Sequence, residues 1–204
     1  MKKVLIINAG QNFGHSGGRY NKTVTESTVE ALKAFSNIEV QVTHIEEGYD
    51  KDEEVQKFVW ADYIIYHTPI WWFQVPFGFK KYLDEVFTAG HNKGLYKSDG
   101  RSSKNPAINY GTGGTLNGRK YMVTTTWNAP ATAFTLPGEF FNETSVDNGP
   151  LFGFHRMNAF LSLERLDGFH FHDVEKNPNV QRDMKLYKEH VLNIFKKELT
   201  SQSV

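Results

Sequence analysis

Short apolar runs along the chain alternate with stretches in which apolar residues recur every three or four positions. Continuous apolar runs at residues 4–7, 63–66 and 121–123 are typical of central strands that are covered on both faces. At residues 38–43, apolar and polar side chains alternate with period two, which predicts an edge strand with one wetter face. A fifth strand is predicted at residues 165–172.

Helical patterns separate these strands. Asn21 and Asp50 are the predicted N-caps of the first two helices, and the residues after Asp50 resemble a capping box. Pro76 suits the first turn of a third helix. A fourth helix is predicted around residues 152–161, and a last one follows Pro178.

This alternation predicts a three-layer α/β fold with right-handed crossovers, and a chain of 204 residues suits one domain, 1–204. Ligands of such folds bind beyond the carboxyl ends of the strands, where the strand order reverses. The site should therefore be built from the loops at residues 9–20, 68–75 and 124–137. Residues 90–118, rich in Gly, Ser, Asn and Lys, are predicted to be an irregular insertion.

Composition narrows the classes of partner. Lys plus Arg and Asp plus Glu number 23 each, so no overall charge draws the protein to nucleic acid or to an anionic membrane. Without cysteine the chain has no thiolate or iron-sulfur chemistry, and redox activity would require a bound cofactor. The apolar run at residues 4–7 is too short for a signal core or an integral membrane segment, which predicts a cytoplasmic protein.

The first loop, AGQNFGHSGGRYN, leaves a strand and enters a helix. Its glycines let backbone amides approach a ligand, and a helix start offers N–H groups and a partial positive charge that suit phosphate. His15, Ser16 and Arg19 add donors. The loop is neither a Walker loop nor a G-x-G-x-x-G fingerprint, so an ordinary flexible connection stays an alternative.

The second loop, TPIWWFQVP, places Trp71, Trp72 and Phe73 between two prolines at the end of a central strand. These rings could be core or dimer contacts. Their position at the carboxyl end of the strand favours a rigid aromatic wall for a planar heterocycle, for which a flavin is the candidate. The third loop, TTTWNAPATAF, brings Trp127 and Asn128 to the same rim.

Other polar residues have more than one interpretation. Tyr110, in NYGTGG, could face a second planar substrate, and His155 could reach the pocket from the predicted fourth helix. His170 and His172 share one face of the last strand and could hold a metal ion. With no third ligand at a recognisable spacing, a solvated strand face is the preferred interpretation.

Several motifs, in order through nearly the whole chain, resemble those of the modulator of drug activity B proteins. That family consists of NAD(P)H:quinone oxidoreductases within the flavodoxin-like FAD proteins. The motifs are GHSGGRYN, WADYII, PIWWFQVPFGFKKYLDEVFTAGH, LYKSDGR, YGTGG, KYMVTTTWNAPATAF and FFN. The resemblance implies a flavodoxin-like α/β/α fold with five parallel strands in the order 2-1-3-4-5, bound FAD and a homodimer.

The resemblance also implies roles for individual residues. One group would hold the pyrophosphate and adenosine end of FAD, a second would flank the isoalloxazine, and a third would line its other edge. In that order the groups are His15, Ser16, Arg19, Tyr20 and Asn21; Pro69, Ile70, Trp71, Trp72 and Phe73; and Thr126, Trp127, Asn128 and Ala129. Tyr110 matches a substrate-side position, His155 loosely resembles a pocket histidine, and both are predicted to assist catalysis.

The predicted reaction is the two-electron reduction of a quinone by NADPH or NADH, with hydride passing through flavin N5 in a ping-pong cycle. Backbone N–H groups at residues 71–73 or 126–129 would stabilise negative charge on the reduced ring. The alternatives are an FMN-binding flavodoxin-type electron carrier, an azo or nitro reductase, and a scaffold without a cofactor. Neutral charge and a loop that carries His15 and Arg19 favour FAD.

Overall fold

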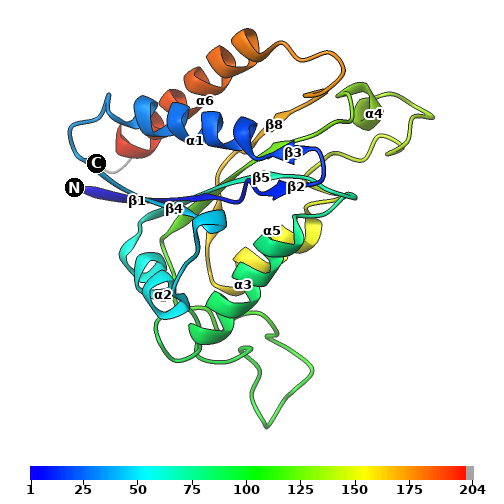
Figure 1. Ribbon diagram of the computed structural model, residues 1–204. Helices are drawn as coiled ribbons and strands as arrows, with labels where there is room; N and C mark the ends of the chain where they lie inside the picture. Colours follow the sequence, from blue (N-terminus) through cyan, green and yellow to red (C-terminus); the bar gives the residue numbers. More distant parts are fainter. Residues whose placement is uncertain (201–204) are drawn as a thin grey trace.

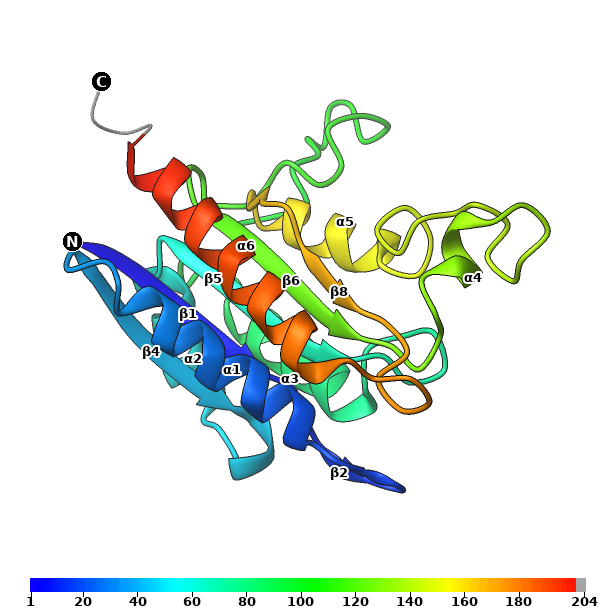
Figure 2. The same ribbon diagram turned by 90° about the horizontal axis from the view of Figure 1, so that it is seen from above.

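The computed structural model describes residues 1–200 and has a parallel sheet between two layers of helices (Figures 1 and 2). The strands that form the sheet are β1 (Lys2–Asn8), β4 (Ile38–His44), β5 (Tyr63–Pro69), β6 (Lys120–Thr126), β7 (Glu164–Arg165) and β8 (Phe169–Phe171). Their order is β4-β1-β5-β6-β7, and β8 also pairs with β6. The predicted five strands in the order 2-1-3-4-5 match this six-stranded sheet approximately, because two short strands, β7 and β8, take the place of the predicted fifth strand.

The prediction of one continuous strand at residues 165–172 was wrong, because residues 166–168 leave the ladder. At Gly168 the chain passes so close to β6 that an added Cβ would lie 2.6 Å from the carbonyl oxygen of Val123. Such a close approach is a common reason for glycine at a break in a strand. The edge position predicted for residues 38–43 is confirmed, since β4 pairs only with β1 among the described strands.

Six α-helices are found in residues 1–200. They are α1 (Arg19–Leu32), α2 (Lys51–Trp60), α3 (Phe77–Ala89), α4 (Thr132–Thr135), α5 (Phe152–Phe160) and α6 (Val180–Thr200), with a short 3-10 turn, η1, at Ile45–Glu47. Figure 1 shows α1 and α6 on one face of the sheet and α2, α3 and α5 on the other.

Asp50 caps α2 as predicted, since its side chain accepts hydrogen bonds from the N–H groups of Asp52 and Glu53. The prediction that Asn21 caps the first helix was wrong. Helix α1 begins at Arg19, and its N-cap is Gly18 with a φ of 66°. Glycine tolerates this left-handed conformation, so the chain turns into the helix at Gly18, three residues before the predicted cap.

The hydrophobic core has two halves, one on each side of the sheet. In β1, Val4 and Ile6 pack toward α1 and α6, whereas Leu5 and Ile7 pack toward the opposite layer. All four are fully buried. The continuous apolar run at residues 4–7 is therefore explained by a strand that is covered on both faces, as predicted.

Residues 90–118 follow α3 and contain only isolated β-bridges, such as His91 with Tyr96. Because α3 crosses back over the sheet between two parallel strands, this insertion starts at the amino edge of the sheet. It hangs below α3 in Figure 1. Among residues 1–200, no helix combines the length and the hydropathy that a membrane crossing requires.

Candidate functional site

A cavity of about 410 Å³ opens at the carboxyl ends of β1, β5, β6 and β8. Its volume lies in the range of small-molecule sites, and its place is the edge that the α/β topology predicted. The residues that line it are His15, Ser16, Gly17, Gly18, Arg19, Tyr20, Asn21, Pro69, Ile70, Trp71, Thr126, Asn128, Val174 and Glu175.

The N-terminus of α1 forms one side of the cavity. Gly18 offers no side-chain cap, and the first turn carries no acidic residue. The first N–H groups of a helix have no partner within the helix, and the helix dipole adds partial positive charge there. With Arg19 beside it, this terminus suits a phosphate group.

Two buried polar atoms at this terminus lack a partner. Tyr20 Oη and Asn21 Oδ1 have no hydrogen bond within the part of the chain that the structure describes. Burial, and secondarily Asp183, raises the pKa of Tyr20 to about 12, so its hydroxyl remains a neutral donor. An unpaired buried polar group costs about 1 to 3 kcal/mol, and both residues line the cavity. They therefore indicate a ligand that pairs with them.

The second loop, at residues 68–76, contains a tight turn. The Trp71 N–H donates to the Gln74 carbonyl at 2.9 Å, and the Gln74 N–H donates back at 3.1 Å. Between them, Trp72 and Phe73 have φ values of 48° and 65°. Positive φ at both central residues is the signature of a type I′ turn, which normally favours Asn and Gly.

This turn separates the predicted aromatic residues. Trp71 lines the cavity, whereas Trp72 is 92% exposed and Phe73 packs on Phe140 with ring centroids 5.3 Å apart. The two adjacent indoles therefore do not face one ligand together within this chain. The cofactor-binding roles of Trp72 and Phe73 stay predictions.

The aromatic partner of Trp71 comes from the first loop. Residues Asn12–Phe13 (β2) and Ser16–Gly17 (β3) form a small hairpin that the sequence reading did not predict. Its Phe13 ring lies 5.1 Å from the Trp71 ring and 5.4 Å from Phe77. A phenylalanine within a glycine-rich loop was the available signal for this cluster.

The loop after β6 presents its two sides differently. Thr126 and Asn128 line the cavity, but the Trp127 indole is 3% exposed and packs against Phe134 and Phe141. Trp127 and Ala129 are not among the lining residues, so their contacts with a cofactor remain predictions.

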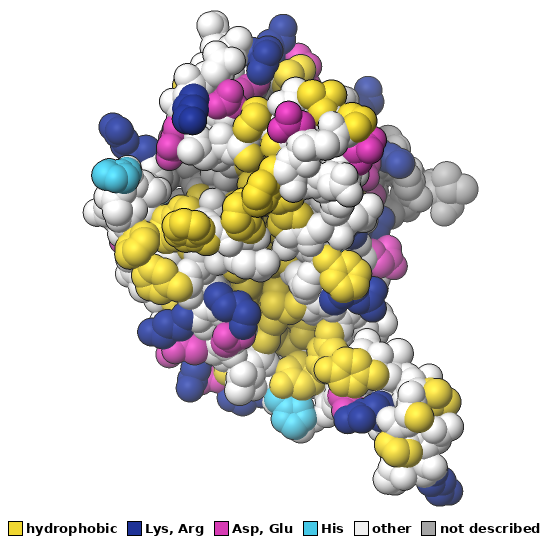
Figure 3. All heavy atoms as spheres, turned by 90° about the vertical axis from the view of Figure 1, so that its right-hand side faces the viewer, with side chains coloured by type: hydrophobic (Ala, Val, Ile, Leu, Met, Phe, Trp, Pro, Cys, Tyr) yellow, Lys and Arg dark blue, Asp and Glu magenta, His cyan; other side chains and the backbone are white. Residues whose placement is uncertain are grey.

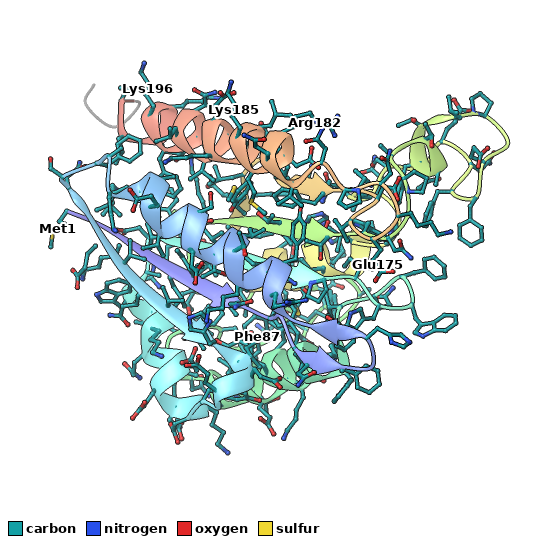
Figure 4. The ribbon with its side chains drawn as sticks, turned by 45° about the horizontal axis from the view of Figure 1, so that its top comes forward. Met1, Phe87, Glu175, Arg182, Lys185 and Lys196 are labelled. Atoms are coloured by element: carbon teal, nitrogen blue, oxygen red, sulfur yellow. The ribbon has the colours of Figure 1, made fainter. Side chains whose placement is uncertain are left out.

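Val174 and Glu175, which follow β8, also line the cavity and were missed by the sequence reading. That reading took loops from the first, third and fourth strands and left out the fifth. The run HDVE after the last predicted strand was the available signal. Glu175 lies at the end of the molecule opposite Met1 (Figure 4).

The two predicted catalytic residues lie outside this cavity. Tyr110 belongs to the insertion, is 71% exposed and packs with Phe160 and under Arg101. His155, on α5, is hydrogen-bonded at both ring nitrogens, to Tyr121 Oη and to Asp147 Oδ1. Neither reaches the cavity of its own chain, so their catalytic roles stay predictions.

The last-strand histidines point to different partners. His170 Nδ1 lies 2.7 Å from Thr125 Oγ1, whereas His172 packs on Phe134 and has an unpartnered Nδ1 within residues 1–200. Burial lowers the pKa of His172. No group of three or more His, Asp or Glu side chains arranged to hold a metal ion occurs in the described part of the chain.

These features fit a planar ligand with a phosphate group. A model of the flavodoxin-like fold family matches residues 2–194. The chain belongs to this family. Its predicted flavodoxin-like fold is thereby confirmed.

One relative of this flavodoxin-like protein is similar over nearly all of its length. It is 45% identical over 192 residues to the NADPH:quinone oxidoreductase MdaB of Haemophilus influenzae, covering 94% of this chain and 98% of that protein. This match confirms the resemblance to modulator of drug activity B proteins.

Solved structures share the fold at lower identity. A putative quinone reductase from Klebsiella pneumoniae aligns with a TM-score of 0.70 and 22% identity, over 94% of this chain and 84% of that one. General stress protein 14 of Treponema denticola, solved in complex with FMN, aligns with a TM-score of 0.62 and 20% identity, over 95% and 97% of the two chains.

Proposed function

We propose that this protein is an NAD(P)H:quinone oxidoreductase that binds FAD in the cavity at the carboxyl ends of the strands. The observation that carries the proposal is the pair of unpartnered atoms, Tyr20 Oη and Asn21 Oδ1, beside the uncapped start of α1. The name of the Haemophilus influenzae relative, which is similar over nearly its whole length, supports the reaction.

A bound flavin supplies the two-electron redox chemistry that a chain without cysteine lacks. The α1 terminus and Arg19 bind its phosphate groups, while Tyr20 and Asn21 pair with polar atoms of the ligand. Trp71, supported by Phe13, provides a flat apolar wall. Thr126 and Asn128, which line the cavity, flank the other edge of the ligand.

FAD is preferred to FMN because His15 and Ser16 line the cavity together with the helix start and could contact a second phosphate. The neutral charge of the chain also differs from that of acidic one-electron carriers. Cofactor released by heat and separated by chromatography tests this choice. FMN as the released species would favour the electron-carrier alternative.

The donor and the acceptor reach the same open side of the cavity in turn. NADPH or NADH is proposed to bind first and leave, after which a quinone occupies the vacated space. Steady-state rates with both substrates varied should give parallel double-reciprocal lines. Intersecting lines would contradict this order.

A homodimer in the cytoplasm is also proposed. Figure 3, which faces the carboxyl ends of the strands, shows hydrophobic side chains gathered on this face, and Trp72, Phe77 and Phe140 are each more than 60% exposed. A second copy would cover them. Tyr110 can serve a substrate only if such a copy brings its exposed ring to the neighbouring cavity. Sedimentation analysis tests the dimer.

The function is tested by the visible spectrum of the purified protein, followed by anaerobic titration with NADPH. We expect a flavin band that bleaches. Tyr20→Phe should weaken flavin binding about fivefold, the effect of one lost hydrogen bond. Tyr187→Phe is the matched control, since Tyr187 packs on the same Phe171 ring but has its hydroxyl partners inside the protein. A protein that stays colourless with excess FAD would refute the proposal.

A further inference from the structure

A series of polar side chains connects the loop after β6 with Asp147. Trp127 Nε1 donates to Thr125 Oγ1 at 2.7 Å, and Thr125 Oγ1 lies 2.7 Å from His170 Nδ1. His170 Nε2 faces Asp147 Oδ1 at 3.6 Å. The same carboxylate oxygen is 2.8 Å from His155 Nε2. The proposed reaction assigns no role to Thr125, His170 or Asp147.

Hydrogen-bond chemistry fixes which group donates and which accepts along this series of side chains. An indole N–H can only donate, so the Thr125 oxygen accepts from Trp127, and its own proton is left for His170 Nδ1. That arrangement places the His170 proton on Nε2, toward Asp147. On the other side, burial raises the pKa of Tyr121, so its hydroxyl donates to His155 Nδ1 at 2.7 Å. Both histidines then present an N–H to one carboxylate.

Asp147 is the acceptor on which both arms converge. The hydrogen bond from His155, and then the close approach of His170, hold the pKa of the carboxyl well below its usual range, although partial burial opposes this. Arg165 Nη1 lies 3.8 Å from the same oxygen. Asp147 precedes α5 and is about 20 residues from the loop in sequence, so only the fold brings it there.

At the other end of this series of side chains, Trp127 lies next to residues that line the cavity. The backbone N–H of Trp127 donates to the Phe171 carbonyl at 2.8 Å, and the backbone N–H of Val174 donates to the Trp127 carbonyl at 3.1 Å. Trp127 is thus fixed by its backbone and by its indole. Its neighbours Thr126 and Asn128, as well as Val174, line the cavity.

We propose that Asp147 is a positioning residue for the cofactor cavity. Asp147 acts through His170 and Thr125 to orient Trp127. Without an acceptor at residue 147, His170 is free to change tautomer or rotamer. The Thr125 hydroxyl then loses its fixed direction, and the indole loses a well-oriented acceptor. The backbone at residues 126–128 would move with it.

The test compares Asp147→Leu, which removes the acceptor, with Asp147→Asn, which retains a carbonyl oxygen. The first readout is the indole N–H resonance of Trp127 in the ligand-free protein, assigned with Trp127→Phe. We expect Asp147→Leu to shift this resonance and to weaken FAD binding about fivefold. Asp147→Asn should stay within about twofold of the wild type in affinity.

Two further variants separate positioning from general destabilisation. Glu198→Leu is the matched control, because Glu198 is another partly buried carboxylate with a cation and a tyrosine as partners, on the opposite side of the sheet. It should leave the Trp127 resonance and the affinity unchanged. In a Thr125→Val background, Asp147→Leu should have no further effect on either readout.

An unchanged resonance in Asp147→Leu, or an equal shift in Glu198→Leu, would overturn the inference. So would a full effect of Asp147→Leu in the Thr125→Val background. The inference rests on the proposed function only in its affinity readout. If the wild-type protein bound no flavin, the proposed function would fail while the indole resonance still decided the role of Asp147.

Discussion

The fully buried His67 predicts a specific loss of stability in mild acid. Its Nδ1 lies 2.8 Å from Thr25 Oγ1, and its Nε2 lies 3.2 Å from Thr28 Oγ1 and 3.0 Å from Tyr187 Oη. All three partners are hydroxyls, and no carboxylate is among them to stabilise a charged ring. Burial lowers the pKa of His67 to about 3.

The sign of the effect follows from proton linkage. Because the pKa in the folded protein lies below that of an unfolded histidine, the unfolded chain binds the extra proton between roughly pH 6.5 and pH 3. The contribution of His67 to the free energy of unfolding is therefore fully present above this window and is lost as the pH decreases through it. The slope is about 1.4 kcal/mol per pH unit, which is large for a protein with roughly 5 to 15 kcal/mol of stability.

The assay is urea unfolding at several pH values between 6 and 4.5, compared with His67→Gln. We expect the variant to start with lower stability but to lose about 2 kcal/mol less over this interval. Acid-sensitive groups such as Asp147 and His172 remain in both proteins, so their contribution cancels. His91→Gln, at an exposed site, controls for the removal of a histidine as such. Equal pH slopes for the wild type and His67→Gln would refute the reasoning.

Three other substitutions test local features of the fold. Replacing Trp72 and Phe73 by Asn and Gly should raise the free energy of unfolding by about 1 kcal/mol, because Asn and Gly suit positive φ. Replacing both by Ala keeps the strain and should not raise it. A gain in stability for the Ala-Ala variant would contradict this reason. Asp50→Ala should lower the free energy of unfolding by about 1 kcal/mol in a denaturant titration, because it removes the cap of α2. Asp50→Asn retains a capping side chain and should lose less. Equal losses in the two variants would argue against capping. Gly113→Ala should lower the melting temperature because the added methyl would overlap the Ser98 carbonyl; an unchanged melting temperature would show that this backbone can yield.

Much of the site could be predicted because its position depends on order along the chain. Apolar runs identified the central strands, and the α/β topology then placed their following loops at one edge. His15, Arg19, Trp71 and Asn128 indeed line one cavity there. The family motifs added the expected ligand, which periodicity alone does not supply.

Side-chain direction could not be predicted in the same way. The adjacent residues Trp71 and Trp72 read alike in sequence, but a turn with two positive φ values sends one to the cavity and the other to solvent. Trp127 lies in a loop that borders the cavity, yet its ring is drawn into the core by Phe134 and Phe141. These outcomes depend on packing partners that are remote in sequence.

The sequence by itself determined the order of strands and helices and the edge at which the loops meet, because periodicity and chain order are local properties. Only the tertiary structure decided which rings face the cavity, that Val174 and Glu175 line it, and that Asp147 lies beside both His155 and His170. Each of these results from contacts between segments that are distant along the chain, and such contacts leave no local period to read.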